Sequence, residues 1–175
     1  MKYFRLIVLL ILSGLLIGGF GDSSASSSAA AVDLNAGDYD PTSPIRKEAV
    51  THIHVQCSPG TCAEIRMGSG QFGSSIHSRG MQNSDGDRLA YNLYTDSSHA
   101  TVWGDGTNGS SFVPLMGTGS PQSFAVYLVV PAGQSVRSGQ YTDTVTISVS
   151  LDDGGSHTSY LNVKANVPSV FKILQ

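Results

Sequence analysis

Residues 141–151 read Tyr-Thr-Asp-Thr-Val-Thr-Ile-Ser-Val-Ser-Leu and decide the fold, because apolar and polar side chains alternate along them. An alternation of period two places successive side chains on opposite faces of a β-strand. The threonines and serines are therefore expected to face solvent. The side chains expected to face a core are Val145, Ile147, Val149 and Leu151.

Segments upstream of this strand repeat the pattern. Residues 49–57, 63–67 and 89–94 alternate in the same way, and residues 123–130 form an apolar run typical of a buried strand. In residues 49–57 the outward side chains are expected to be His52, His54 and Gln56. The inward positions predicted in the three alternating segments are Ile53, Val55, Cys57, Ala63, Ile65, Met67, Leu89, Tyr91 and Leu93.

Turn-forming runs rich in Gly, Asp, Asn and Pro separate the strands at 84–87, 104–109, 131–133 and 152–155. The sequence contains no amphipathic helical pattern of ten or more residues. Short strands punctuated by such turns indicate an all-β protein, and a β-sandwich is the predicted architecture. A β-barrel is the alternative.

The tail carries a further strand at residues 160–167, which alternate without a break. One face of this strand is apolar, and such a strand is suited to filling a hydrophobic groove between two sheets. The residues on that face are Leu161, Val163, Ala165 and Val167.

The chain begins like a secretory signal. Lys2 and Arg5 precede an apolar run over residues 6–20, which is short for a membrane span and rich in small residues near its end. Small residues near Gly21, near Ala25 and at 29–31 offer cleavage sites. An uncleaved anchor is the alternative. A Ser/Ala tract over 22–31 follows and is expected to be a flexible leader.

Charge argues against two classes of partner. The chain has ten basic and thirteen acidic residues, and without Lys2 and Arg5 the net charge is −5. A mildly acidic surface without a basic stripe argues against nucleic acid and against anionic lipid head groups.

Two cysteines, Cys57 and Cys62, flank Ser-Pro-Gly-Thr. In an oxidising compartment such a close pair predicts a structural disulfide, and Pro59 and Gly60 favour the turn it needs. A metal knuckle and a redox-active pair are the alternatives. Two thiols alone do not fill a tetrahedral zinc site, and four intervening residues differ from the usual redox spacing.

Other chemistry is sparse. His52 and His54 share a strand face but lack a nearby third metal ligand, and the acidic residues of the Gly-rich loops, Asp85, Asp87 and Asp105, lack calcium-loop spacing. A nucleophile elbow and a phosphate-binding loop are both absent from the sequence. We therefore expect no enzyme activity, no metal and no cofactor.

Several motifs together resemble the spore coat protein U domain, which is shared with subunits of archaic (Csu-type) chaperone–usher pili. They lie in residues 79–107, 126–134 and 139–146, and residues 34–41 are similar to the family's opening motif, with Ala36 in place of Phe. The residues that carry the resemblance are Arg79, Met81, Tyr91, Tyr94, Trp103, Gly104, Asp105, Gly106, Gln134, Tyr141 and Asp143.

The resemblance implies an immunoglobulin-like β-sandwich of pilin type that lacks its last strand. A periplasmic chaperone would hold the open groove, an outer-membrane usher would export the subunit, and a neighbouring subunit would fill the groove by strand addition. The implied function is a structural subunit of a surface pilus or spore-coat-like assembly that supports attachment and biofilm. The implied location is the periplasm in transit and then the cell surface, or secretion.

The chain departs from the family pattern at both ends. The usual N-terminal donor strand and its following Cys are missing, whereas residues 160–167 resemble the donor strand and Phe171 stands where the family has Cys. About eight residues join residues 151 and 160, so the tail is able to complete its own sandwich. Donation to a neighbour and a truncated second domain are the alternatives.

The expected organisation is a signal peptide over residues 1–21, a leader over 22–31, a spore coat protein U-like domain over 32–151 and a donor-like strand and tail over 152–175. The alternative function is a monomeric, self-complemented surface binding module, or adhesin. An exposed apolar cluster at Phe112, Val113, Leu115 and Met116 would favour it, although these residues also suit a buried loop or strand. Trp103 is interpreted as a core anchor rather than a sugar-binding aromatic.

Overall fold

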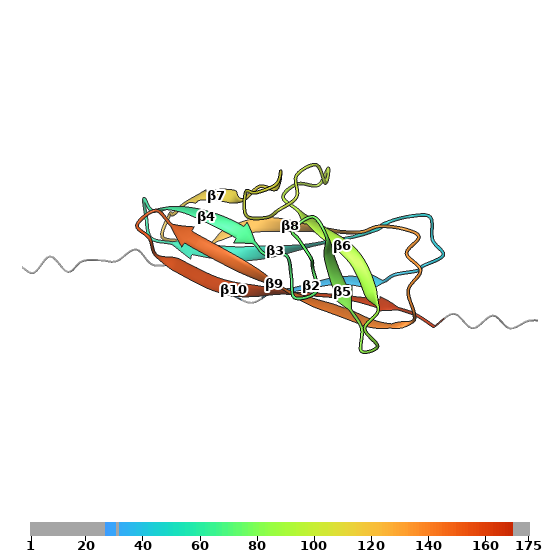
Figure 1. Ribbon diagram of the computed structural model, residues 1–175. Helices are drawn as coiled ribbons and strands as arrows, with labels where there is room; N and C mark the ends of the chain where they lie inside the picture. Colours follow the sequence, from blue (N-terminus) through green and yellow to red (C-terminus); the bar gives the residue numbers. More distant parts are fainter. Residues whose placement is uncertain (1–26, 31, 170–175) are drawn as a thin grey trace, which may run out of the picture.

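A computed structural model describes residues 27–30 and 32–169, and every regular element in them is a strand (Figure 1). The signal peptide, most of the leader and Phe171 lie outside the described residues. Within the described part no helix is long and apolar enough to cross a membrane. The strands are β1 (Ser27–Ala29), β2 (Val32–Asp38), β3 (Lys47–Cys57), β4 (Cys62–Met67), β5 (Arg79–Gln82), β6 (Arg88–Tyr94), β7 (Val113–Met116), β8 (Gln122–Val130), β9 (Gly139–Leu151) and β10 (Ser156–Val167).

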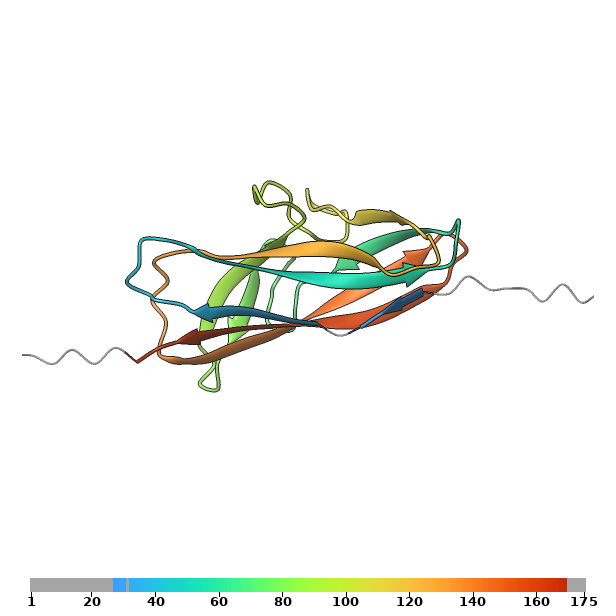
Figure 2. The ribbon, with the colours of Figure 1, turned by 180° about the vertical axis from the view of Figure 1, so that it is seen from behind.

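The strands form a sandwich whose two layers are joined by hydrogen bonds. The path runs β1-β3-β8-β6-β5-β9-β10-β2, and β4 pairs with both β9 and β7. The β5–β6 hairpin links the layers, because β6 pairs with β8 on one side and β5 reaches β9 on the other. Seen from behind, β3 and β8 form a layer above the layer of β2 and β10 (Figure 2). The predicted all-β sandwich is confirmed.

One continuous core lies between the layers. The side chains predicted to face it from β3, β4, β6 and β9 are all buried, and the outward histidines of β3 are exposed. β8 also matches its prediction, with Val126, Leu128 and Val130 fully buried. The period-two alternation therefore identified the core face of each long strand.

The C-terminal strand begins earlier than predicted. β10 starts at Ser156, so the link from β9 is a four-residue turn rather than a loop of about eight residues. In this turn Leu151 N–H donates to Gly155 O, and Gly154 has the left-handed φ of 89° that favours glycine. β9 and β10 thus form a β-hairpin, the shortest connection between antiparallel strands.

Four strands were not predicted. β1 lies within the leader and pairs with β3, β5 pairs with β6, β7 pairs with β4, and β2 runs parallel to β10. β1 starts at one end of the elongated molecule and β10 ends at the other (Figures 1 and 2).

Candidate functional site

The groove predicted to need a complementing strand is occupied by β10 of the same chain. β10 pairs antiparallel with β9 along all twelve of its residues, from Ser156 opposite Ser150 to Val167 opposite Gly139. On its other side β10 pairs parallel with β2. Both edges of β10 are therefore hydrogen-bonded within its own sandwich.

The four apolar side chains of β10 enter the core. They are at most 2% exposed, and Ser159 continues the inward row at 5%. The sequence placed these side chains on one face, and the structure places that face against the core. The four residues are Leu161, Val163, Ala165 and Val167.

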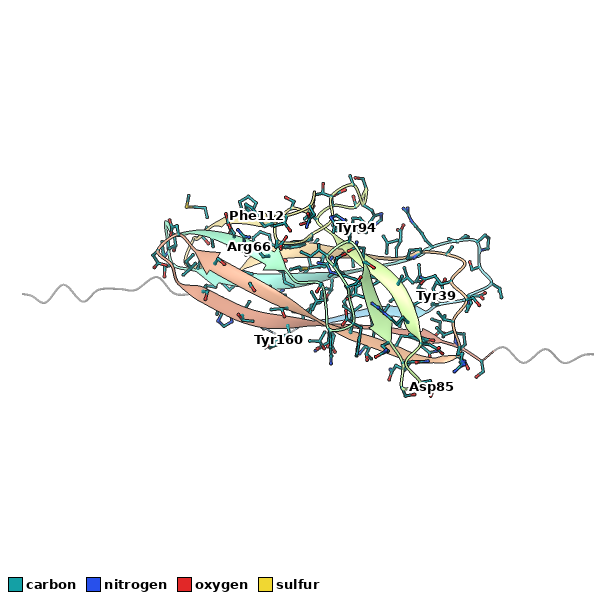
Figure 3. The ribbon with its side chains drawn as sticks, viewed as in Figure 1. Tyr39, Arg66, Asp85, Tyr94, Phe112 and Tyr160 are labelled. Carbon is teal, nitrogen blue, oxygen red and sulfur yellow. The ribbon has the colours of Figure 1, made fainter. Side chains whose placement is uncertain are left out.

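The outer side of β10 is tied to β2 by polar contacts. Asn162 Nδ2 donates to Asp33 Oδ1 at 3.2 Å, and Asn166 Nδ2 donates to Asp38 Oδ1 at 2.8 Å. Lys164 Nζ lies 3.7 Å from Asp33 Oδ2. These contacts favour the parallel register. The backbone continues this register just beyond β2, where Tyr39 N–H donates to Asn166 O at 2.7 Å. The outward Tyr160 is half exposed and points away from the core (Figure 3).

β2 has a weak signal in the sequence. Residues 32–36 alternate, and Leu34 and Ala36 are buried beside β10. The run is short and is broken by Gly37, whose φ is 72°. Five alternating residues next to a Ser/Ala tract resemble a loop in sequence, so the partner of β10 was missed.

Arg79, one of the family-motif residues, is buried and holds four separate segments together. Its guanidinium donates to Gly68 O at 2.7 Å, to Trp103 O at 2.7 Å and to Asn92 Oδ1 at 2.6 Å, and also contacts Met67 O. Burial lowers the pKa of Arg79 to about 10, which leaves it charged at neutral pH. A buried cation surrounded by carbonyl oxygens is a structural clamp.

Tyr91 and Asp143 form a second buried polar pair. Tyr91 Oη donates to Asp143 Oδ2 at 2.6 Å, while Asp143 Oδ1 accepts from Gln71 N at 2.7 Å and from Thr144 N at 2.8 Å. Burial, followed by the charge of Asp143 and this hydrogen bond, raises the pKa of Tyr91. The phenol therefore remains protonated and donates. The pair fixes the loop around residue 71 to β9.

Trp103 is a core anchor, as interpreted from the sequence. It is 1% exposed, and Nε1 donates to Ile65 O at 3.0 Å. The following Gly-Asp-Gly turn is closed by Asp105 Oδ1, which accepts from Thr107 N at 2.9 Å and from Thr107 Oγ1 at 2.7 Å. The Thr107 hydroxyl, then its backbone N–H, lowers the pKa of Asp105.

The remaining motif residues also fasten loops to strands. The amide of Gln134 bonds both backbone groups of Ala90, as a neighbouring strand would. Tyr141 Oη donates to Arg137 O at 2.9 Å. Met81 is fully buried, and the ring of Tyr94 packs edge-on against His99. The motif is thus distributed over the whole sandwich and does not converge on one reactive centre.

The predicted disulfide between Cys57 and Cys62 is absent from the structure, which corrects that prediction. Cys57 is a free, buried thiol, and burial raises its pKa. The physical reason lies in the strand that carries it. Cys57 is the last inward position of β3, in line with Ile53 and Val55, so its side chain packs as a small apolar group in the core.

The apolar cluster that would have favoured an adhesin is largely internal. Leu115 is buried, Phe112 and Val113 are half-buried, and Met116 is 57% exposed. β7 thus packs on the sandwich edge instead of forming an apolar platform. Among the described residues, no group of three or more His, Cys, Asp or Glu side chains is placed to hold a metal ion.

Comparison with solved structures shows that the fold is one used by fimbrial adhesive subunits. The CupB6 tip adhesin from Pseudomonas aeruginosa matches with a TM-score of 0.56 at 9% identity, covering 81% of this chain and 40% of that one. CfaE, the adhesive subunit of CFA/I fimbria of enterotoxigenic Escherichia coli, matches with a TM-score of 0.52 at 14% identity, covering 80% and 46%. This chain therefore spans less than half the length of either adhesin.

Sequence comparison is more specific than the fold. Protein U of Myxococcus xanthus is 36% identical over 142 residues, covering 75% of this chain and 78% of that protein. The model of the Spore Coat Protein U domain matches residues 22–148, which include every motif residue discussed above. The chain therefore belongs to the spore coat protein U domain family.

Proposed function

We propose that this protein is a non-enzymatic structural subunit of a pilus-type or coat-like surface assembly, and that it complements itself. Its own β10 fills the groove that a neighbouring subunit would otherwise fill. The observation that carries the proposal is the complete pairing of β10 with β9, together with the four core side chains that β10 contributes. Such a subunit ends an assembly or stays outside it.

Energetics favour the intramolecular strand. Burying a Leu or Val side chain fully contributes about 1.5–3 kcal/mol, and β10 buries Leu161, Val163 and Val167. A short tether gives an effective concentration of roughly millimolar, and the four-residue turn is near the lower limit of tether length. To displace β10, a donor strand from a neighbour has to overcome both the burial free energy of these side chains and the high effective concentration of the tethered strand.

The proposal includes the partners and location of the family type. A periplasmic chaperone and an outer-membrane usher would handle the chain during export, and the mature subunit would lie at the cell surface or in the surrounding matrix, where it would support attachment and biofilm. Self-complementation would alter the binding of the chaperone, because the chaperone and β10 would compete for the same groove.

The test compares the full mature chain with a chain that lacks residues 156–175. A synthetic peptide of residues 156–169 is added to each in trans, and size-exclusion chromatography and peptide incorporation are measured. The full chain is expected to be a monomer that excludes the peptide. The shortened chain is expected to aggregate alone and to become a soluble complex with the peptide, since the groove is then open.

The matched control is the same peptide with Val163→Asp, which places a charge where β10 is buried. It is expected to leave the shortened chain aggregated. Full-length chains that form concentration-dependent multimers and take up the unaltered peptide would contradict self-complementation.

A further inference from the structure

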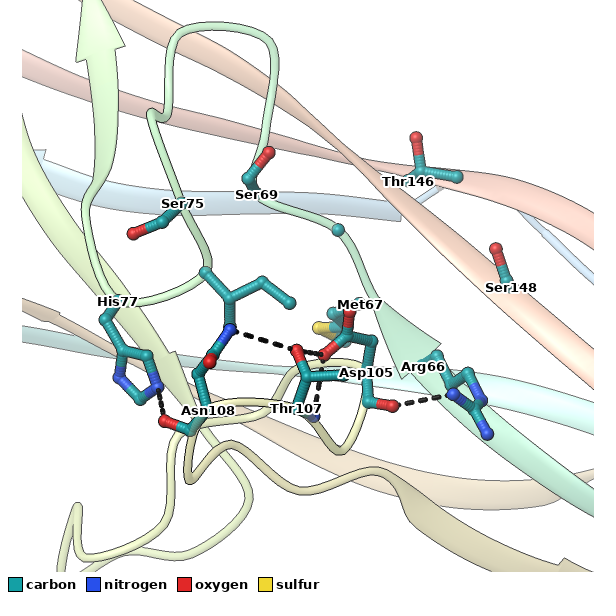
Figure 4. A pocket seen from close by; sticks show the side chains of 12 residues that line it. Arg66, Met67, Ser69, Ser75, His77, Asp105, Thr107, Asn108, Thr146 and Ser148 are labelled. Carbon is teal, nitrogen blue, oxygen red and sulfur yellow. Dashed lines mark hydrogen bonds between the residues drawn. The ribbon is translucent and has the colours of Figure 1, made fainter.

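A cleft of about 630 Å³, lined mainly by residues with polar side chains, opens on the outer face of the β9 layer, away from the groove filled by β10 (Figure 4). The loop that carries Ser75 and His77 and the adjoining turn around Asn108 form one side of the cleft. The floor is the solvent face of β9, with Thr146 and Ser148 two residues apart. The volume lies in the range of small-molecule sites, about 300–1,000 Å³.

The two loops that line the cleft are fastened to each other. His77 Nε2 lies 2.9 Å from Asn108 O, which joins the two loops directly. Behind them, a Cβ on Gly104 would lie 2.6 Å from Ile76 Cγ2, so only glycine permits this close approach. The Asp105 carboxylate closes the second loop onto Thr107. The cleft is therefore preformed, which lowers the entropy that binding has to overcome.

Arg66 stands at the rim with its charge already satisfied. Its guanidinium contacts the Glu64 carboxylate, donates to Asp105 O at 2.6 Å and lies 4.9 Å from the centre of the Phe112 ring. These three contacts fix the side chain. Because Glu64 offsets the charge, the rim favours a polar neutral ligand over a strongly anionic one.

The hydroxyls that face the cleft are available. The Oγ atoms of Ser75, Thr146 and Ser148 form no side-chain hydrogen bond with any group in the described part of the chain, although all three residues line the cavity. Each hydroxyl is able to donate and to accept. Thr146 and Ser148 are separated by about 7 Å along the strand, a spacing that hydroxyls on one or two sugar rings span. Ile76 adds an apolar wall for ring carbons.

From this arrangement we propose that the cleft is a binding site for a neutral saccharide unit. Its free hydroxyls match the donor-and-acceptor hydroxyls of a sugar, and its charged groups are paired with protein partners. The inference goes beyond the assembly role and does not depend on it. A chain that fails the β10 test is still able to bind a saccharide here, because β10 does not line the cleft.

The test is an amide NMR titration of the full mature chain with glucose, galactose, mannose, N-acetylglucosamine, maltose and cellobiose in turn. At least one sugar is expected to give saturable shifts that are confined to the two loops and to β9 around residues 146–148. The double variant T146V/S148V removes both floor hydroxyls and keeps strand-forming side chains. It is expected to weaken binding about tenfold, as the loss of two hydrogen bonds implies.

Two matched variants separate the site from the strand. Thr144 lies on the same face of β9 but does not line the cleft. The Thr144→Val variant is therefore expected to leave the affinity for the sugar unchanged. The exchange T146S/S148T keeps both hydroxyls and is expected to retain binding. If the double valine variant does not fold, Ser75→Ala on the loop wall is expected to weaken binding instead.

Three outcomes would overturn the proposal. The first is that none of the six sugars gives saturable shifts. The second is that Thr144→Val weakens binding as much as T146V/S148V does. The third is that acetate or sulfate binds the cleft more tightly than every sugar, which would make it an anion site centred on Arg66.

Discussion

Replacing Leu161 with alanine tests whether β10 stabilises its own sandwich. Leu161 is fully buried in β10, opposite Val145 of β9. A buried Leu→Ala change destabilises by about 2–5 kcal/mol, from lost transfer free energy and the cavity left behind. With a urea m-value of about 2 kcal/mol/M, a loss of about 3 kcal/mol lowers the unfolding midpoint by about 1.5 M.

Trp103 provides the assay, because it is the one tryptophan in the chain and is 1% exposed. Its fluorescence in a urea titration reports exposure of the core. The matched control is Thr158→Val, an exposed position on the same strand, which is expected to change stability by no more than about 0.5 kcal/mol. The difference between the two variants isolates the buried face of β10.

Protein concentration distinguishes self-complementation from donation to a neighbour. If β10 acts within its own chain, the urea midpoint does not depend on concentration. If it acts on a neighbour, each tenfold increase in concentration adds about 1.4 kcal/mol of apparent stability. A concentration-dependent midpoint, or a Leu161→Ala shift no larger than the control, would refute the reasoning.

Three further changes test the parts that hold the sandwich together. Tyr91→Phe removes the donor to Asp143 and is expected to lower the free energy of unfolding by about 1–3 kcal/mol, measured by urea denaturation. Gly104→Ala places a Cβ within 2.4 Å of a neighbouring hydroxyl and is expected to cost about 1–3 kcal/mol in the same assay. The pKa of Asp96 is lowered to about 2, first by the Ser98 hydroxyl, from about 3.9 in an unfolded chain. Its stabilising contribution is thus present above about pH 4 and is lost as the pH falls toward 2; an NMR titration should find the low midpoint, and Ser98→Ala should raise it.

Sequence pattern predicted the long strands because each has a clear two-residue period. In β3, β9 and β10 every second side chain faces inward without a break. The local alternation of apolar and polar residues is therefore enough to predict which side chains are buried. β1 and β7 have no such row. They are three and four residues long. They form because they pair with β3 and β4, and this pairing cannot be predicted from the local sequence pattern.

The polar interior was harder to predict than the apolar one. Arg79 is a charged residue, and charged residues are normally exposed. In the fold, carbonyls from β4, its following residue and Trp103 converge on it. These carbonyls belong to two segments, residues 67–68 and residue 103, that are far apart in sequence. The disulfide predicted from the close spacing of Cys57 and Cys62 is absent from the structure, and Cys57 is a free thiol buried at the end of β3, an inward position that the alternation did predict.

The edges of the sandwich extend the argument about assembly. In the described part of the chain the hydrogen-bonded paths end at β1, β2 and β7, which have three, seven and four residues. β7 contains Pro114, which lacks an N–H, and β2 contains Gly37 in the left-handed conformation. Short edges, proline and irregular backbone oppose further strand pairing. β10 itself is paired on both sides. A neighbour that adds a strand must therefore either displace β10 or pair with an unfavourable edge. Because both routes are unfavourable, they support the proposal of a subunit that ends an assembly over one that extends it.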